Sequence, residues 1–124
     1  MRVLKINELK ETPMDTATPV AGWTGGPVIR TRQVVIGDGQ SENFRCAVVN
    51  FRVGATTGWH VHDSDQILGV PEGTGFAAPE TEHRGITVGG IGHIRAGEGH
   101  WHGGTADAPL SHITVTTVGS KSKH

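Results

Sequence analysis

Two His-x-His pairs constrain this chain more than any other feature of its sequence. The first is His60-Val61-His62, and the second is His100-Trp101-His102, forty residues further on. Successive side chains of an extended strand alternate between faces, so the two imidazoles of each pair lie on the same face. Two such strands that face each other would gather imidazoles around one point. The pattern therefore predicts a metal site between two strands.

A further donor follows the first pair. Gln66 comes after the acidic turn 63–65 and offers an uncharged amide oxygen. Neutral imidazole suits first-row divalent metals, and an amide oxygen is a hard donor. The candidate metal ligands are therefore His60, His62, Gln66 and His100. Three or four donors on one side of an ion leave positions open for substrate, as catalysis requires. For Gln66 the alternative is an amide beside the ion that orients water.

Two more histidines are candidates for proton transfer. His102 shares a face with His100 and therefore faces the same ion. His112 lies in an alternating segment, where Thr114 and Thr116 share its face. An unliganded imidazole beside a divalent cation stays neutral at pH 7 and can accept a proton. The alternative for His102 is a structural hydrogen bond, and for His112 a core position bonded to a backbone carbonyl.

The remaining histidines and one arginine have weaker claims to a role. His83 and His93 are expected at the surface, and no function is assigned to them. Arg95 is expected to be a surface residue, with contact to an anionic substrate as its alternative. His124 ends a polar Lys-Ser-Lys-His segment and is expected to be solvated.

The rest of the sequence has the pattern of short strands. Nineteen glycines and few helix-forming runs separate the apolar segments, which indicates roughly nine or ten strands in an antiparallel sandwich or small barrel. Segment 43–53 is apolar on both faces, as in a strand inside a sandwich. Residues 71–75 are predicted to form a turn, and Trp23 is expected to plug one end of the core.

These patterns predict an all-β chain folded as an antiparallel sandwich or small barrel. A single domain over 1–124 is expected, with an irregular arm over 1–26, a strand core over 27–118 that begins at Pro27, and a tail over 119–124. A chain of this length supports one core.

Composition narrows the classes of function. With 11 basic and 12 acidic residues, the charge offers no reason to expect nucleic acid or an anionic membrane as partner. The single cysteine, Cys46, excludes an intrachain disulfide framework and is expected to be a core residue. No apolar run approaches the roughly 20 residues of a membrane span, and the first residues lack the apolar segment of a signal peptide. We therefore expect a cytoplasmic protein that acts on a small molecule.

The spacing of these glycines and ligands resembles the two motifs of the cupin family. The first motif reads Gly54, five residues, His60-x-His62, three residues, Gln66, six residues, Gly73, with Gln66 where Glu is usual. The second reads Gly89, five residues, Arg95-x-Gly97, two residues, His100, with Arg95 where Pro is usual. Both occur in order, with 15 residues between them. The resemblance implies a jelly-roll barrel.

A narrower resemblance concerns the small, manganese-dependent, cupin-type hydroxynitrile lyases. It is carried by Gln66 and by the runs Trp23-Thr24-Gly25, His100-Trp101-His102-Gly103 and Leu110-Ser111-His112-Ile113. This resemblance implies a manganese ion held by His60, His62, Gln66 and His100, with iron, zinc and nickel as alternatives. It also implies that His102 and His112 are catalytic, with His102 transferring the proton.

We therefore interpret the chain as an enzyme, a metal-dependent lyase. The metal would act as a Lewis acid while His102 moves a proton, and a carbon–carbon bond of a small aldehyde or α-hydroxy compound would be formed or cleaved. One alternative is an Fe(II)-dependent dioxygenase, and another is a binding or sensor domain without turnover. A homodimer is expected because the edges of a sandwich require covering.

Overall fold

The computed structural model describes residues 1–14, 17–20, 22–26, 30–79, 82 and 84–124. Pro27, where the strand core was predicted to begin, and His83 lie outside these described residues. Within them, every paired strand is antiparallel, and one turn of 3-10 helix precedes the strands. The elements are η1 (Ile6–Glu8), β1 (Glu11–Pro13), β2 (Thr18–Pro19), β3 (Arg30–Ile36), β4 (Phe44–Phe51), β5 (Ala55–Thr56), β6 (Val61–His62), β7 (Gln66–Ala78), β8 (Gly85–Thr87), β9 (Ile91–Ile94), β10 (Trp101–Gly104), β11 (Leu110–Thr117) and β12 (Ser122–Lys123).

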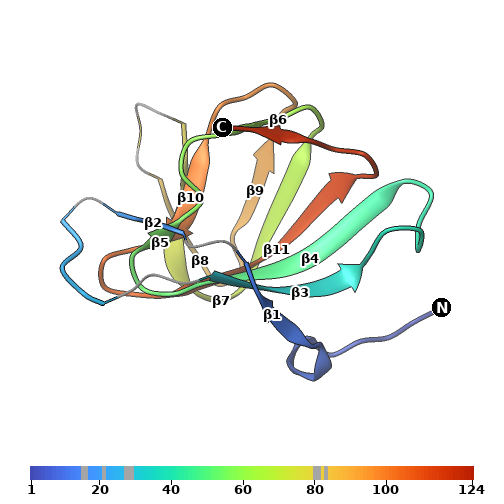
Figure 1. The fold of residues 1–124 in the computed structure, drawn as a ribbon, viewed down its shortest axis with the longest axis horizontal. Helices are drawn as coiled ribbons and strands as arrows, with labels where there is room; N and C mark the ends of the chain where they lie inside the picture. Colours follow the sequence, from blue (N-terminus) through green and yellow to red (C-terminus); the bar gives the residue numbers. More distant parts are fainter. Residues whose placement is uncertain (15–16, 21, 27–29, 80–81, 83) are drawn as a thin grey trace.

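The large sheet has the order β1-β3-β4-β11-β7-β10-β5-β2, and β8 and β9 also pair with β7. Figure 1 shows this sheet curling, with β3, β4 and β11 on one side and β10 and β5 on the other. The curl turns the inner faces of distant strands toward each other. The predicted all-β, antiparallel jelly-roll architecture is confirmed.

Strand β7 corrects one prediction. Residues 71–75 do not form a turn between two strands, because β7 continues through them from Gln66 to Ala78. Its first part pairs with β11, and its second part pairs with β10. Gly73 has φ +94°, and a Cβ there would lie 2.5 Å from the carbonyl oxygen of Pro109. Glycine therefore bends the strand between the two sides of the barrel instead of ending it.

The core lies inside the curled sheet. It is built around six buried residues: Ala17, Val49, Phe51, Ala55, Val70 and Leu110. On β4, Val48 and Val49 are both buried although they point to opposite faces, but Phe44 is 51% exposed, so the two-faced burial predicted over 43–53 holds only toward the end of the strand. Trp23 packs against the core and donates a hydrogen bond from Nε1 to the carbonyl oxygen of Gly26 at 3.1 Å, as expected for a plug.

The segments outside the central strands also join the structure. From the arm, β1 pairs with β3 and β2 pairs with β5. From the tail, β12 pairs with β6, the strand that carries His62. Among the described residues, no helix has the length and apolar character needed to cross a bilayer.

Candidate metal centre

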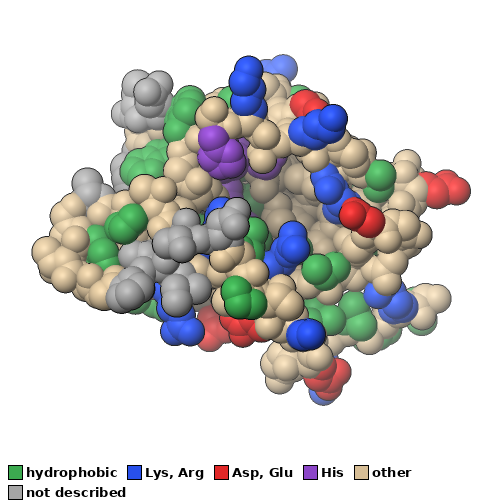
Figure 2. Space-filling model, viewed as in Figure 1, with side chains coloured by type: hydrophobic (Ala, Val, Ile, Leu, Met, Phe, Trp, Pro, Cys, Tyr) green, Lys and Arg blue, Asp and Glu red, His purple; other side chains and the backbone are tan. Residues whose placement is uncertain are grey.

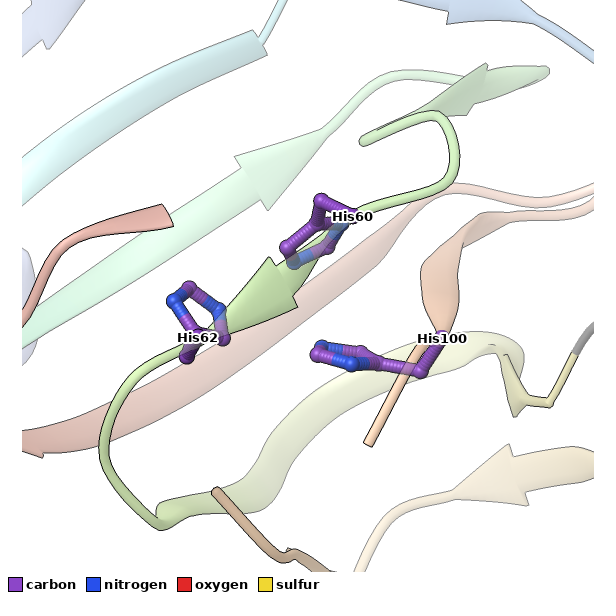
Figure 3. A group of neighbouring side chains, drawn as sticks. All are labelled: His60, His62 and His100. Carbon is purple, nitrogen blue, oxygen red and sulfur yellow. The ribbon is translucent and has the colours of Figure 1, made fainter. Parts of the chain in front are cut away.

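Three imidazoles converge between two facing segments. His60 and His100 form an isolated antiparallel bridge, in which the backbone N–H of each donates to the carbonyl oxygen of the other at 2.9 Å. His62 ends β6, two residues after His60 and on the same face. Figure 3 shows His100 pointing toward His60 and His62 from the facing segment. The candidate ligand atoms of the three residues all lie within 4.8 Å of one another, so the three histidines could hold a metal ion.

Backbone carbonyls fix the tautomers of two of these rings. His60 Nδ1 lies 3.0 Å from the carbonyl oxygen of Gly58, and His100 Nδ1 lies 2.9 Å from that of Glu98. A carbonyl oxygen only accepts, so each Nδ1 carries the proton and donates it. The lone pair of each Nε2 is then free to bind a metal. Metal-binding histidines commonly bind through one ring nitrogen while the other donates a hydrogen bond that orients the ring.

Gln66 supplies the fourth candidate donor from the start of β7. Its Nε2 donates to Thr114 Oγ1 at 2.7 Å, which fixes the amide and directs Oε1 away from Thr114. Oε1 of Gln66 is buried and has no hydrogen-bond partner among the described residues, and the same is true of Nε2 of His62 and of His100. Buried polar atoms normally have partners. Buried polar atoms without partners on His62, Gln66 and His100 fit a bound cation, and these donor types suit a divalent first-row metal.

Burial keeps the three imidazoles uncharged. It is the largest cause that lowers the pKa of His60, to about 4, and the neighbouring His100 and His62 lower it further. Burial and then His100 lower the pKa of His62, and burial lowers that of His100. Neutral imidazole at pH 7 is the state that a metal requires.

His102 and His112 form a buried pair beside this centre. They are 4% and 1% exposed, and His112 Nε2 lies 3.1 Å from His102 Nδ1. The ring of His102 is stacked at 5.5 Å from that of His100, and the ring of Phe51 packs against both members of the pair. Burial lowers the pKa of His102 well below its ordinary value and that of His112 to about 4. The pair is therefore neutral at pH 7.

The acidic turn anchors neighbouring chain instead of bonding to the histidine ligands. Asp65 accepts a hydrogen bond from Ala96 N at 2.9 Å and lies 3.0 Å from His93 Nε2, so the surface residue His93 helps to hold the turn. Asp63 Oδ1 accepts from the backbone N–H of Lys121 at 2.8 Å. Arg95 is exposed, as predicted. His83 lies outside the described residues.

One contact was missed by sequence reasoning. His124 is exposed, as expected, but its ring stacks on that of His60 with centroids 5.5 Å apart. The only signal in the sequence was a histidine two residues after Ser122 in a polar tail, where the two side chains would share a face of a strand. That signal does not say which strand the tail pairs with.

A cavity of about 330 Å³ adjoins His62 and Gln66, and Arg32 and Arg45 lie in its wall. Figure 2 shows Lys and Arg side chains around a hollow that has histidine at its edge. A larger cavity of about 830 Å³ lies against the outer face of β3 and β4, and none of the candidate ligands lines it. Another cavity, of about 490 Å³, is lined by His100. The cavity beside His62 and Gln66 adjoins two of the candidate ligands and is therefore the better placed for a substrate of the metal centre.

Comparisons with known proteins agree with this fold. No family model matches the chain. The (R)-mandelonitrile lyase of Granulicella tundricola is 36% identical over 74 residues, which cover 56% of this chain and 53% of the relative. The match thus spans about half the length of that curated relative.

Solved structures give the same fold. A cupin-like protein from Thermotoga maritima is 27% identical with a TM-score of 0.70, over 87% of this chain and 85% of that one. A predicted oxalate decarboxylase from the same organism is 16% identical with a TM-score of 0.73, over 94% and 98%. The polyketide cyclase RemF from Streptomyces resistomycificus is 16% identical with a TM-score of 0.76, over 94% and 79%. The resemblance to the cupins is confirmed, and the chain has the cupin fold.

Proposed function

We propose that this protein is a metal-dependent lyase that cleaves or forms a carbon–carbon bond of a small α-hydroxy compound, with a cyanohydrin as the first substrate to test. The observation that carries the proposal is the buried His102–His112 pair next to three converging imidazoles. The partial similarity to an (R)-mandelonitrile lyase supports the same chemistry.

The metal would be held by His60, His62, Gln66 and His100, with manganese preferred over iron, zinc and nickel. These donors are all neutral, so a divalent ion would keep its full formal charge. When bound, the ion supplies a Lewis acid that stabilises negative charge developing on the substrate oxygen.

To His102 we assign the role of taking the hydroxyl proton. Its Nε2 is buried without a partner among the described residues, and its ring lies 5.3 Å from that of His60 and 5.5 Å from that of His100. For Nε2 to accept a proton, Nδ1 must carry one and donate it to His112 Nε2. His112 thereby holds His102 in the tautomer that a general base needs.

The proton balance of cyanohydrin cleavage follows from these positions. The hydroxyl proton passes to Nε2 of His102, the O–H electron pair forms the carbonyl, and the C–C pair leaves with cyanide. The proton on His102 then passes to cyanide, which gives hydrogen cyanide and the aldehyde. Because burial lowers the pKa of His102, the imidazolium releases its proton readily, and the neutral base is restored.

The test is release of benzaldehyde from mandelonitrile by protein loaded with Mn(II), followed by ultraviolet absorbance. We expect His102→Ala to lose roughly 100-fold or more of the rate, since a positioned acid–base group contributes about 10²–10⁴-fold. Lys10→Ala is the control, because Lys10 is exposed and does not line the cavity beside His62 and Gln66. Activity that survives in His102→Ala would remove the proposed proton transfer.

Two further assays separate the alternative functions. Oxygen consumption by the Fe(II)-loaded protein would identify a dioxygenase, since histidine donors also suit that ion. Binding of a small molecule by metal-loaded protein, without turnover by any of the four metals, would identify a binding or sensor domain.

We also propose that the protein forms a homodimer. Several apolar side chains are exposed on strands: Val34 (44%), Phe44 (51%), Ile67 (49%) and Ile91 (78%). Exposed apolar residues on strands favour association with another chain. Sedimentation equilibrium would give twice the mass of the chain if this is right, and the mass of one chain if it is wrong.

A further inference from the structure

The chain from Ser120 to His124, here called the C-terminal strap, lies along β6, the strand that carries His62. In β12, Ser122 pairs with His62 and Lys123 pairs with Val61. Figure 1 shows β12 at the top of the molecule, beside β6 and away from the central sheet. The strap is thus the hydrogen-bonded neighbour of β6.

The strap also holds the turn that separates two candidate ligands. Asp63 N donates to the carbonyl oxygen of Lys121 at 3.1 Å, and Lys121 N donates to Asp63 Oδ1 at 2.8 Å. Ser64 Oγ donates to Ser120 Oγ at 2.7 Å. These residues of the turn stand between His62 and Gln66 in the chain, so the three contacts constrain how the two donors are placed relative to each other.

A third set of contacts joins the strap to β4 and to the candidate ligand His60. Arg45, on β4, donates from Nη2 to the carbonyl oxygen of Ser120. At the other end of the strap, the ring of His124 stacks on that of His60 with an interplanar angle of 27°. The strap is therefore tied to β4 at its start and rests against a candidate ligand at its end.

We propose that the C-terminal strap is part of the metal centre: it positions His62 and Gln66 through the 63–65 turn and covers His60 with the imidazole of His124, so that it tightens metal binding and slows metal release. The inference rests on the proposed metal centre. It makes Ser120 and His124 positioning residues, since neither lies within the group of converging ligand atoms.

A purely structural role would have a different signature. A strap that only stabilises the fold would change the unfolding temperature of the metal-free protein and leave the affinity of the folded protein for metal unchanged. A strap that positions ligands changes metal affinity. Groups that orient metal ligands typically contribute about 10–100-fold in affinity.

The experiment compares the wild-type chain with three separate variants. One is a chain that ends at Gly119, and the other two are the full chains with Ser64→Ala or His124→Ala. Lys123→Ala is the matched control, because Lys123 joins β12 through its backbone and its side chain is exposed. The Kd for Mn(II) is measured by isothermal titration, and the release rate by electron paramagnetic resonance of Mn(II) after a chelator is added. The unfolding temperature of each metal-free protein is measured in parallel.

We expect the shortened chain to bind Mn(II) at least about tenfold more weakly. In His124→Ala, metal release should accelerate severalfold with no change in the unfolding temperature without metal, and Lys123→Ala should match wild type. If the shortened chain does not fold, Ser64→Ala and His124→Ala decide the question. Unchanged Kd and release rates in these two variants would overturn the role of the strap while leaving the metal centre intact. A wild-type chain that binds no Mn(II), Fe(II), Zn(II) or Ni(II) would overturn both.

Discussion

Replacement of Gln66 by Glu tests the charge of the proposed metal centre most directly. Gln66 is 4% exposed, its Nε2 is bonded to Thr114, and its Oε1 is buried without a partner among the described residues. Glu has nearly the same shape. The Thr114 hydroxyl can donate to one carboxylate oxygen while the other takes the position of Oε1, so the change adds one negative charge and little else.

Two opposing terms set the size of the effect. A unit negative charge about 4 Å from a divalent ion gains about 8 kcal/mol at an effective dielectric constant of about 20. Burying a carboxylate costs several kcal/mol. We therefore expect Gln66→Glu to bind Mn(II) more tightly by about 1–3 kcal/mol, which is roughly 5- to 150-fold in Kd.

The metal-free protein should respond in the opposite direction. Without the ion, the new carboxylate is buried among neutral imidazoles and has no cation to neutralise it. The metal-free variant should therefore unfold more easily than wild type, by about 1–3 kcal/mol. When Mn(II) is added, its tighter binding should compensate for this loss of stability. A ligand that binds only the folded state stabilises that state, and the gain grows with the logarithm of the ratio of ligand concentration to Kd.

The assay combines isothermal titration with Mn(II) and urea unfolding with and without the metal. Gln66→Met is the control, because it keeps a similar volume and removes the oxygen donor, so it should lose affinity without adding charge. A Glu variant that binds Mn(II) no more tightly than wild type would refute the charge argument. A Met variant with wild-type affinity would show that Gln66 is not a ligand.

Three further predictions follow from other parts of the structure. Burial lowers the pKa of His112 from 6.5 to about 4 in the folded chain, so the unfolded chain takes up a proton first as pH falls. His112 alone should then contribute a loss of roughly 3 kcal/mol in the stability of the metal-free protein between pH 6.5 and about pH 4, in addition to the loss from the other buried histidines. In urea unfolding, His112→Leu should remove this part of the dependence, and an unchanged slope would contradict it. Because Arg32 lines the cavity beside the proposed ligands, the Mn(II)-loaded protein should bind the anion mandelate about tenfold or more tightly than neutral mandelamide. Calorimetry of Arg32→Gln should show a smaller difference between the two affinities. Equal binding of both compounds by wild type would refute this prediction. A Cβ at Gly103 would lie 2.2 Å from a carbonyl oxygen of β5, whereas a Cβ at Gly69 would meet nothing within 4 Å. Thermal unfolding should therefore show Gly103→Ala destabilised by at least about 1–3 kcal/mol and Gly69→Ala much less affected. Similar losses of stability in both variants would be inconsistent with the packing.

Much of the site could be predicted because it depends on local geometry. The two-residue period of a strand puts His60 and His62 on one face whatever the rest of the chain does. The same rule explains why Thr114 shares a face with His112 and reaches Gln66. The glycine and ligand spacing resembles the two cupin motifs, and that resemblance predicted the jelly-roll fold.

Contacts between strands that are not sheet neighbours could not be predicted in this way. His102 and His112 lie on β10 and β11, which are separated by β7 in the sheet order. They meet at 3.1 Å because the sheet curls and turns their inner faces toward each other. The bend of β7 that allows this occurs in a Pro- and Gly-containing segment that, by local pattern alone, predicts a turn.

The amino-acid sequence by itself determined which side chains share a face, since alternation along a strand depends only on the backbone of that strand. The tertiary structure alone decided which strand lies against which. The tail illustrates this, because its polar residues carry no apolar pattern, and yet it pairs with β6 through backbone hydrogen bonds, with further contacts from Asp63, Ser64 and Arg45. Such pairing arises from backbone groups that are the same in every residue except proline, and for that reason it leaves no mark in the sequence.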